Sequence, residues 1–189
     1  GEILLKGPVV FKGYWKNEEA TNDTFTDDGW FKTGDIGELD DTGHLRITGR
    51  KKDIIVTAGG KNVSPGPMED RMRAHPLVSQ AVVVGDGRPF CSVLVSLDDE
   101  AVQKWKSEHN VPEHTTVREL AANAVLRAEI QDAVNSANEL VSQAEAIKKF
   151  HILPRDLTEE DGELTPTMKV KRAIVLDKFS RDVEDMYHR

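Results

Sequence analysis

The first fifty residues of this chain consist of short strand-like stretches separated by glycine-containing turns. The turn sequences Asp27-Asp28-Gly29 and Asp41-Thr42-Gly43 are of the kind that reverse the direction of a strand. The simplest architecture is a small antiparallel sheet or partial barrel, which is too short to bury a good core alone. We therefore expect it to pack on something outside these residues. Its predicted strands are residues 2–5, 9–15, 30–31 and 44–48, with one helical turn at 17–20.

After Arg50 the pattern changes to a mixture of strands and helices. Two apolar runs separated by the segment Gly85-Asp86-Gly87-Arg88-Pro89 predict a hairpin with a long loop. We predict an α+β fold in two parts: residues 1–50 form the small antiparallel β piece, and residues 51–189 form a compact α+β domain whose small sheet is flanked by helices. The predicted strands of this domain are residues 53–57, 79–84, 90–97 and 150–153, and helices are predicted at 98–109 and 180–188.

Two further helices are marked by their end signals. Ser64-Pro65 is an N-cap residue followed by proline at the first helical position, and His75-Pro76 closes that short helix. Thr116 and Glu119 form a capping box for a helical region that reaches about Ala146. Its apolar residues recur at steps of three and four, which indicates a helix facing the core. They are Leu126, Ile130, Val134, Ala137, Val141 and Ala144.

Composition restricts the partners and the compartment. With 25 basic and 33 acidic residues the formal net charge is −8, which argues against nucleic acid, because phosphate binding needs clustered Lys and Arg. The single cysteine, Cys91, lies in an apolar run, so we predict a buried structural thiol and a reducing cytoplasm. No apolar stretch reaches the roughly 20 residues of a transmembrane helix, and no signal peptide is recognisable. Because the chain starts without Met on a strand-like pattern, we expect it to be part of a longer protein.

Two turn segments carry groups suited to a small polar ligand. In Thr33-Gly34-Asp35 the glycine allows a sharp turn, and the two oxygens of the Asp35 carboxylate could accept hydrogen bonds from the two hydroxyls of a ribose. Taken alone, Asp35 is an ordinary turn residue. Arg50 could bind ribose or phosphate through its planar fork, or could form a structural ion pair with Asp35 or Glu38.

Two later segments are also candidates. Gly59 and Gly60 follow an apolar strand and permit close approach of a ligand or another chain, although an ordinary loop has the same composition. Lys169 lies in a basic cluster at residues 164–172. Its ammonium group could reach a developing negative charge, although a solvated basic face explains the cluster equally well. The sequence has no Walker-type loop, no H-E-x-x-H, no zinc-type cysteine pair and no G-x-S-x-G elbow, and we predict no metal site.

In combination and in order, these four segments resemble the late motifs of the adenylate-forming superfamily, which includes acyl-CoA synthetases, luciferases and peptide-synthetase adenylation domains. The opening Gly1-Glu2-Ile3-Leu4 and the later Gly13-Tyr14-Trp15 are similar to another family segment, so the resemblance runs from Gly1 to Arg172. Residues 57–65 and 164–169 are most similar to long-chain fatty-acid-CoA ligases. Other members more often have Ser-Gly-Lys where this chain has Thr-Met-Lys.

The resemblance implies roles in acyl-adenylate formation for three residues. Asp35 would hold the ribose hydroxyls of ATP and of the acyl-adenylate, and Arg50 would assist at the ribose. Lys169 would be the adenylation lysine, which bridges the fatty-acid carboxylate and the α-phosphate as pyrophosphate leaves.

For the second half-reaction the resemblance implies a rotation of the C-terminal domain. Lys52 would lie at the hinge of that rotation. Gly59 and Gly60 would then line the pantetheine channel, and Lys61 would contact the CoA phosphates.

The resemblance further implies that residues 1–50 are the trailing β segment of a large N-terminal adenylation domain, and that residues 51–189 are its mobile C-terminal domain. The large domain would supply the phosphate loop, the acyl tunnel and the magnesium-binding acid, so these residues alone are not expected to be active. The expected partners are the chain's own N-terminal domain, a fatty acid, ATP with Mg, and CoA. The implied location is the cytoplasm, with peripheral membrane association through the lipid substrate as an option.

Two alternatives remain open. The first is the C-terminal part of an adenylation enzyme for an aryl, amino or other acid, since acid specificity would lie in the large domain. The second is a non-catalytic interaction module that kept the fold. The presence of Asp35, Arg50 and Lys169 together argues against a pure scaffold, which has no need of all three.

Overall fold

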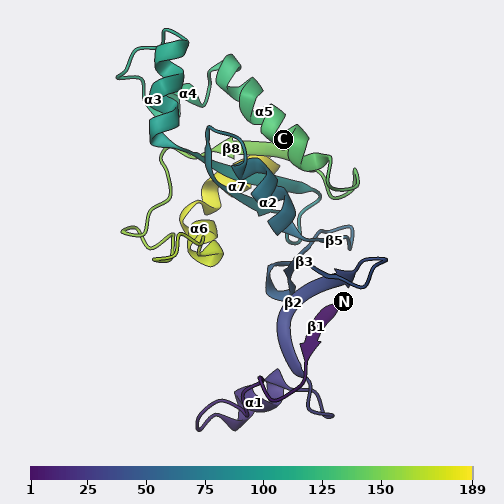
Figure 1. Cartoon of the computed structure of the whole chain (residues 1–189). Helices are drawn as coiled ribbons and strands as arrows, with labels where there is room; N and C mark the ends of the chain where they lie inside the picture. The colour runs from purple at the N-terminus through teal and green to yellow at the C-terminus, as the bar shows by residue number, and fades with distance from the viewer. Residues whose placement is uncertain (189) are drawn as a thin grey trace. The chain divides into compact units, whose positions relative to one another are not determined.

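A three-stranded antiparallel sheet, in the order β1-β2-β3, forms the N-terminal part of the protein (Figure 1). The structure is a computed structural model that describes residues 1–188, and it divides into two compact units, Gly1–Ile54 and Ile55–Arg189. Glycines make the predicted reversals, since Gly29 has a φ of +80° and Gly43 a φ of +85°, a conformation that glycine adopts readily. The elements of this unit are β1 (Glu2–Leu5), α1 (Glu18–Thr24), β2 (Phe31–Leu39), β3 (Leu45–Arg50) and the 3₁₀ turn η1 (Lys51–Asp53).

The predicted strand at residues 9–15 is wrong. This segment is a loop, in which only Tyr14 forms an isolated bridge, with Asn17. The Phe11 ring lies 5.6 Å from the ring of Phe25 and 5.3 Å from that of Phe31. Aromatic packing therefore holds this loop in the place of strand pairing.

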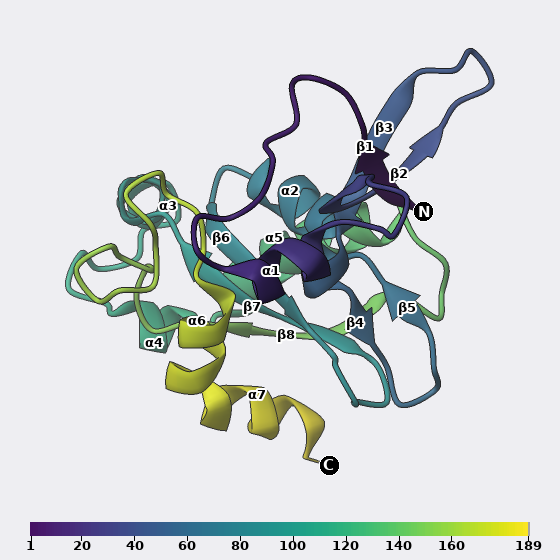
Figure 2. The ribbon, with the colours of Figure 1, turned by 90° about the horizontal axis from the view of Figure 1, so that it is seen from below.

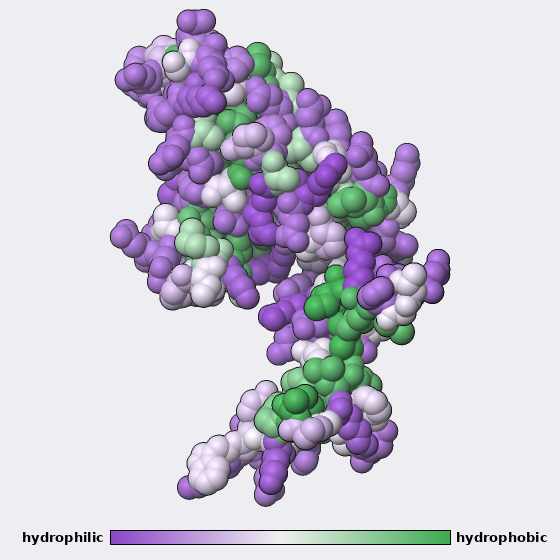
Figure 3. Space-filling view, viewed as in Figure 1, coloured by the Kyte–Doolittle hydropathy of each residue, from purple (hydrophilic) through white to green (hydrophobic). Residues whose placement is uncertain are grey.

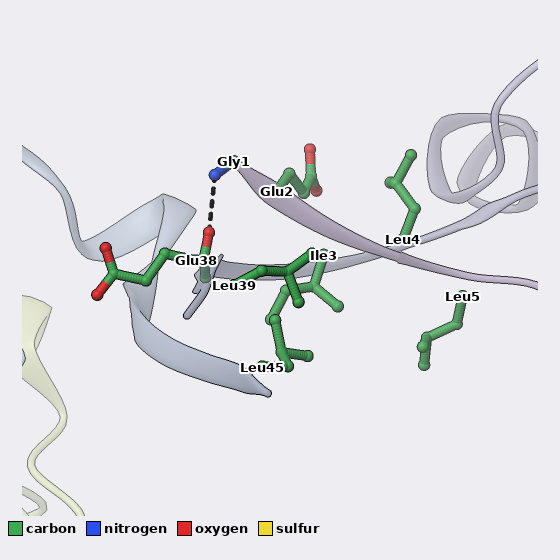
Figure 4. Close-up of a pocket in the computed structure, with 9 residues that line it drawn as sticks. Gly1, Glu2, Ile3, Leu4, Leu5, Glu38, Leu39 and Leu45 are labelled. Carbon is green, nitrogen blue, oxygen red and sulfur yellow. Dashed lines mark hydrogen bonds between the residues drawn. The ribbon is translucent and has the colours of Figure 1, made fainter. Parts of the chain in front are cut away.

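The strands of the N-terminal unit carry exposed apolar side chains (Figure 3). A shallow groove beside β1 is lined in part by Ile3 and Leu45 (Figure 4). A Cβ added at Gly37 would lie 2.8 Å from the backbone O of Arg46 and 2.9 Å from Ile3 Cδ1, so the floor of this groove requires glycine. The Gly1 amine donates a hydrogen bond to Gly37 O at 2.8 Å. The exposed apolar residues of these strands are Leu4, Leu5, Leu39, Leu45 and Ile47.

A second sheet, in the order β6-β7-β8, forms the centre of the C-terminal unit (Figures 1 and 2). β6 and β7 are the antiparallel arms of the predicted hairpin, and β8 pairs with β7 in parallel. The sheet elements of this unit are β6 (Val78–Val84), β7 (Cys91–Leu97) and β8 (Ile147–Ile152), with a separate small pair, β4 (Ile55–Val56) and β5 (Asn62–Val63). The helices are α2 (Pro65–Arg73), α3 (Asp99–Glu108), α4 (Val117–Leu120), α5 (Ala124–Asn138), α6 (Arg172–Lys178) and α7 (Ser180–Tyr187).

The central strand β7 separates two apolar clusters. All of its residues are buried, and successive side chains point to opposite faces of a strand. Val93 and Val95 belong to the larger cluster with helices α2 and α5, whereas Leu94 belongs to the smaller cluster with α6 and α7 (Figure 2). Cys91 is a fully buried free thiol in the larger cluster, as predicted, and burial raises its pKa.

The long helical region predicted up to Ala146 is interrupted. The capping box of Thr116 and Glu119 is present, but α4 ends at Leu120. Asn123 then caps a new helix, α5, by accepting hydrogen bonds from the backbone N of the following residues. The first four residues of the predicted stripe are buried in α5, while Val141 and Ala144 lie beyond its end at Asn138.

Two other expectations need correction. The strand predicted at residues 53–57 is limited to β4, because η1 occupies the positions before it. Helix α6 was not predicted, and it precedes the predicted final helix, which is α7. Within residues 1–188, no helix is long and apolar enough to cross a membrane.

Candidate functional site

Asp35 and Arg50 are brought together by the pairing of β2 with β3. The two residues are register partners, and Arg50 Nε lies 3.3 Å from Asp35 Oδ1. Gly34, directly before Asp35, has a φ of +75°, but the two residues lie inside strand β2, where its pairing with β1 is irregular, and not in the loop that the sequence predicted. Thr33 Oγ1 accepts a hydrogen bond from Asp35 N at 3.1 Å. The structural ion pair is therefore present, on side chains that are 31% (Asp35) and 69% (Arg50) exposed and remain accessible to a ligand.

Lys52 lies in the 3₁₀ turn η1, the last element of the N-terminal unit. Its side chain is exposed. The division between the two units follows two residues later, after Ile54. The residue predicted to be the hinge therefore lies in a short turn that directly precedes the division between the two units.

The glycine pair lies in a tight turn between β4 and β5. Gly60 N donates to Thr57 O at 2.8 Å, and Thr57 N donates to Lys61 O at 3.0 Å. Gly60 has a φ of +74°, whereas Gly59 has no positive φ. A Cβ added at Gly59 would meet only Thr57 Oγ1, at 3.9 Å. The turn itself therefore requires glycine at position 60, and leaves open space at position 59.

Lys61 is engaged by a carboxylate of the same unit. Its Nζ lies 3.6 Å from Glu145 Oε1. The Ser142 hydroxyl donates to the other Glu145 oxygen at 2.6 Å. Hydrogen bonds from Ser142, together with the Lys61 charge, lower the pKa of Glu145. A phosphate that binds Lys61 would compete with this ion pair.

Lys169 lies near the tip of a hairpin closed by a bridge between Leu164 and Val170. Thr165 N donates to Lys169 O at 2.8 Å, and Lys169 N donates to Thr165 Oγ1 at 3.0 Å. Met168 has a φ of +60°, which is uncommon for a residue other than glycine, Asn or Asp. The Lys169 side chain is exposed, and the ion pairs near this hairpin, within residues 1–188, involve other residues. Its ammonium group is therefore available to an anion.

A buried acidic residue precedes this hairpin and was not singled out from the sequence. Glu163 is 0% exposed and receives a bidentate ion pair from Arg155, at 2.7 and 2.8 Å, and a further hydrogen bond from Lys178 Nζ at 3.2 Å. Thr158 N also donates to it at 3.1 Å. The Arg155 guanidinium is the main reason why the pKa of Glu163 falls to about 2. In the sequence, Glu163 differs from the other acids of residues 159–163 only by the apolar residue that follows it.

The other end of the hairpin is anchored by Arg172 at the start of α6. Arg172 donates to Val83 O at 2.7 Å and to Glu69 Oε1 at 2.5 Å. Glu69 Oε1 also accepts from Val83 N at 2.7 Å. The hairpin is thus tied to strand β6 and helix α2 on its C-terminal side.

The predicted site residues fall into two groups. Asp35, Arg50 and Lys52 belong to the N-terminal unit. The C-terminal unit contains the glycine turn, Lys61 and the Lys169 hairpin. Within residues 1–188, no group of three or more His, Cys, Asp or Glu side chains is placed to hold a metal ion.

The C-terminal unit is thus an α+β unit with an exposed lysine on an anchored hairpin and a turn that contains two glycines. Residues 52–189 match the family model described as "AMP-binding enzyme C-terminal domain", and the chain belongs to this family. The predicted resemblance and fold class are thereby confirmed.

The relatives include named fatty-acid-CoA ligases. The chain is 58% identical over all 189 residues to the long-chain-fatty-acid-CoA ligase FadD15 of Mycobacterium tuberculosis, and covers 31% of that protein. It therefore spans about a third of the length of this curated relative.

Solved structures are also similar to this chain. The adenylation domain of a carboxylate reductase from Mycobacterium chelonae has a TM-score of 0.79 and 25% identity, with 99% of this chain and 27% of that chain covered. ATP-bound MatB from Rhodopseudomonas palustris has a TM-score of 0.61 and 26% identity, with 100% of this chain and 31% of that chain covered.

Proposed function

We propose that this chain is the C-terminal part of an ATP-dependent long-chain fatty-acid-CoA ligase. The reaction would run in two steps: a fatty acid and ATP give acyl-adenylate and pyrophosphate, and the acyl-adenylate and CoA then give acyl-CoA and AMP. The observation that carries the proposal is the 58% identity to FadD15 along the whole chain. Residues 1–50 would belong to the large adenylation domain and residues 51–189 to the mobile C-terminal domain.

In the first step Lys169 would act as an electrostatic catalyst. A carboxylate oxygen of the fatty acid attacks the α-phosphorus of ATP, and the bond to pyrophosphate breaks. Negative charge at these oxygens would be compensated by the Lys169 ammonium group. Its exposure at the end of an anchored hairpin supports this role, because a charge held on a rigid base loses little freedom when the transition state forms.

The nucleotide would be held in part by Asp35 and Arg50. The Asp35 carboxylate can accept from both ribose hydroxyls, and Arg50, at 3.3 Å from it, orients the carboxylate. ATP is used with magnesium in such reactions. The described residues offer no cluster of metal ligands, and we assign no magnesium ligand to this chain.

In the second step the glycine turn would approach the pantetheine arm of CoA. The open space at Gly59 supports close approach of a narrow chain. Lys61 would exchange its partner Glu145 for a CoA phosphate. Lys52 would be the hinge of a domain rotation between the two steps. This rotation would move the Lys169 hairpin away from the acyl-adenylate and bring the glycine turn to it.

A second candidate is the adenylation of another class of carboxylic acid. The TM-score of 0.79 with a carboxylate reductase adenylation domain favours it, because a similar fold then occurs in an enzyme that is named for a different reaction. The full-length protein should be assayed with long-chain, short-chain and aromatic acids, with and without CoA. Release of pyrophosphate reports the first step, and release of AMP reports the second. CoA-dependent release of AMP with long-chain acids alone supports the ligase. Activity only with aromatic acids would replace it by the second candidate.

The role of Lys169 is tested in the same protein with Lys169→Ala. We expect acyl-adenylate formation to fall by about 10²-fold or more, whereas thioester formation from supplied acyl-adenylate should change little. Lys171→Ala, which removes a neighbouring positive charge, is the matched control. Equal loss of both half-reactions in Lys169→Ala would remove the assignment.

Location and membrane contact are tested separately. We propose a cytoplasmic enzyme that contacts membranes only peripherally, where its fatty acid is dissolved. Sedimentation of the full-length protein with phospholipid vesicles, in the presence and absence of a long-chain acid, measures this contact. Binding that does not respond to the acid would contradict contact through the substrate.

A further inference from the structure

Glu163 is a charged residue in a place where charge is costly. Its side chain is 0% exposed, and a buried carboxylate is tolerated only when it is paired and hydrogen-bonded. Arg155 fulfils this requirement with two parallel hydrogen bonds, which fix direction as well as distance. Lys178, from α6, adds a third donor. With the amide of Thr158 as the fourth, four donors converge on this one carboxylate.

The backbone of Glu163 closes the base of the Lys169 hairpin. Glu163 O accepts a hydrogen bond from Lys171 N at 2.7 Å. The next residue, Leu164, is buried and forms the bridge to Val170. The backbone hydrogen bonds that begin at Glu163 therefore extend to Lys169, six positions along the chain.

The hairpin has few other supports. Leu164 is its buried residue, whereas the positions from Pro166 to Lys169 are exposed. On the far side Arg172 ties the chain to Val83 and Glu69. The direction of the exposed tip is consequently set by two ion pairs at its base, and in one of them the Glu163 carboxylate is fully buried.

We propose that Glu163 is a positioning residue for acyl-adenylate formation: with Arg155 and Lys178 it fixes the base of the hairpin, and so fixes where the Lys169 ammonium group is presented. This inference rests on the proposed function of Lys169. A displacement of about 1 Å in a catalytic group can cost about 10²-fold in rate. Loss of this anchor should therefore act on the one step in which Lys169 takes part.

The test uses Glu163→Gln in the full-length protein, which keeps the size of the side chain and removes its charge. We expect kcat for adenylate formation to fall about tenfold or more, with little change in the KM values for ATP and fatty acid. Thioester formation from supplied acyl-adenylate should stay within about twofold of the wild-type rate. Glu160→Gln, an exposed acid of the same loop, is the matched control and should leave both steps unchanged.

Hydrogen exchange gives a readout that does not depend on catalysis. In Glu163→Gln the amides of Lys169 and Lys171, which are bonded to Thr165 Oγ1 and Glu163 O, should exchange about tenfold faster or more, because the closed hairpin opens more often. The amides of β7, which exchange when the whole domain opens, should accelerate by a smaller factor. Exchange that becomes faster by the same factor across the domain would identify Glu163 as a general stability residue and overturn the proposal.

Arg155→Lys answers the same question in a milder way. It keeps the positive charge but loses the bidentate fork, and it decides the matter if Glu163→Gln cannot be purified. Slower adenylation with an unchanged thioester step supports positioning, and unchanged adenylation or equal losses in both steps overturn it. Lys169→Ala is measured in parallel. If Lys169→Ala leaves adenylate formation intact, the proposed function of Lys169 fails. If Lys169→Ala slows adenylate formation but Glu163→Gln and Arg155→Lys do not, only the positioning role of Glu163 is refuted.

Discussion

Arg50 Nε lies 3.3 Å from Asp35 Oδ1, across the paired strands β3 and β2. The side chains are 69% and 31% exposed, so water screens their attraction and the pair stabilises the fold by no more than about 1 kcal/mol. Because the pair contributes little to folding and is accessible to solvent, its side chains can bind a ligand without a large loss of stability.

Asp35→Asn should therefore separate binding from stability. We expect the free energy of unfolding to change by less than about 1 kcal/mol, while the KM for ATP in the full-length protein rises about tenfold or more, because an ionised hydrogen-bond acceptor for the ribose is lost. Thermal melting and ATP-dependent pyrophosphate release measure the two effects. Glu38→Gln, an exposed acid in the same strand, is the control, and an equal rise in KM there would contradict a specific role of Asp35.

Glu163 should make the stability of the C-terminal unit depend on acid pH. Ion pairing with Arg155 lowers the pKa of Glu163 from 4.5 to about 2. A carboxyl group whose pKa is lower in the folded than in the unfolded state stabilises the fold above the unfolded value, and this stabilisation is lost as the pH falls from 4.5 towards 2.

Urea unfolding between about pH 7 and about pH 3 measures this contribution. The stability difference between the wild type and Glu163→Gln should shrink as the pH falls through this window. Glu160→Gln should follow the wild type throughout. A difference that stays constant with pH would mean that the Glu163 charge contributes nothing to folding.

The two neighbouring glycines should respond differently to substitution. Gly60 has a φ of +74°, so Gly60→Ala should lower the free energy of unfolding by about 1 kcal/mol. Gly59→Ala meets no close atom and should leave the melting temperature unchanged, yet slow thioester formation if that face lines the pantetheine channel. Adenylate formation is the internal control for Gly59→Ala. Normal thioester formation would move the channel contact away from Gly59.

Lys52 is expected to act through the freedom of its backbone. Proline fixes φ and removes an amide donor, so Lys52→Pro in the full-length protein should spare one half-reaction and slow the other at least about tenfold. Lys52→Ala keeps the backbone freedom and should leave both rates close to those of the wild type. Equal rates for Lys52→Pro in both steps would remove the hinge role.

Met168 provides a test of backbone strain next to Lys169. Its φ of +60° lies in the left-handed region, and its side chain is 61% exposed. Met168→Gly therefore removes the backbone strain and loses little buried side-chain surface. The free energy of unfolding should stay equal or rise by up to about 1 kcal/mol. Gly162→Ala, which places a side chain at a φ of +77°, should have the opposite effect. A marked loss of stability in Met168→Gly would show that the methionine packs against the domain.

Local signals in the sequence predicted much of the fold. The hairpin of β6 and β7 follows from apolar runs around a glycine-rich loop, and the start of α4 follows from its capping box. The strand predicted at residues 9–15 failed because Phe11 packs on Phe25 and Phe31. Such a preference for tertiary packing over strand pairing has no periodic signature.

The site was predicted unevenly for the same reason. Gly60 and Asp35 are recognisable because their backbone or turn chemistry is local. The ion pair of Glu163 with Arg155 and Lys178 joins residues 8 and 15 positions apart in an irregular loop and a helix, and no spacing rule connects them. Its existence depends on the closure of the smaller apolar cluster.

Leu94 and Val95 are adjacent in β7 but pack into different cores. Val95 faces the larger cluster, and Leu94 faces the cluster that also holds Leu164 at the base of the hairpin. Changes at Val95 and at Leu94 therefore disturb different cores, and of the two only the core of Leu94 contains a residue of the Lys169 hairpin. One strand thus reaches the hairpin through one face and the larger core through the other.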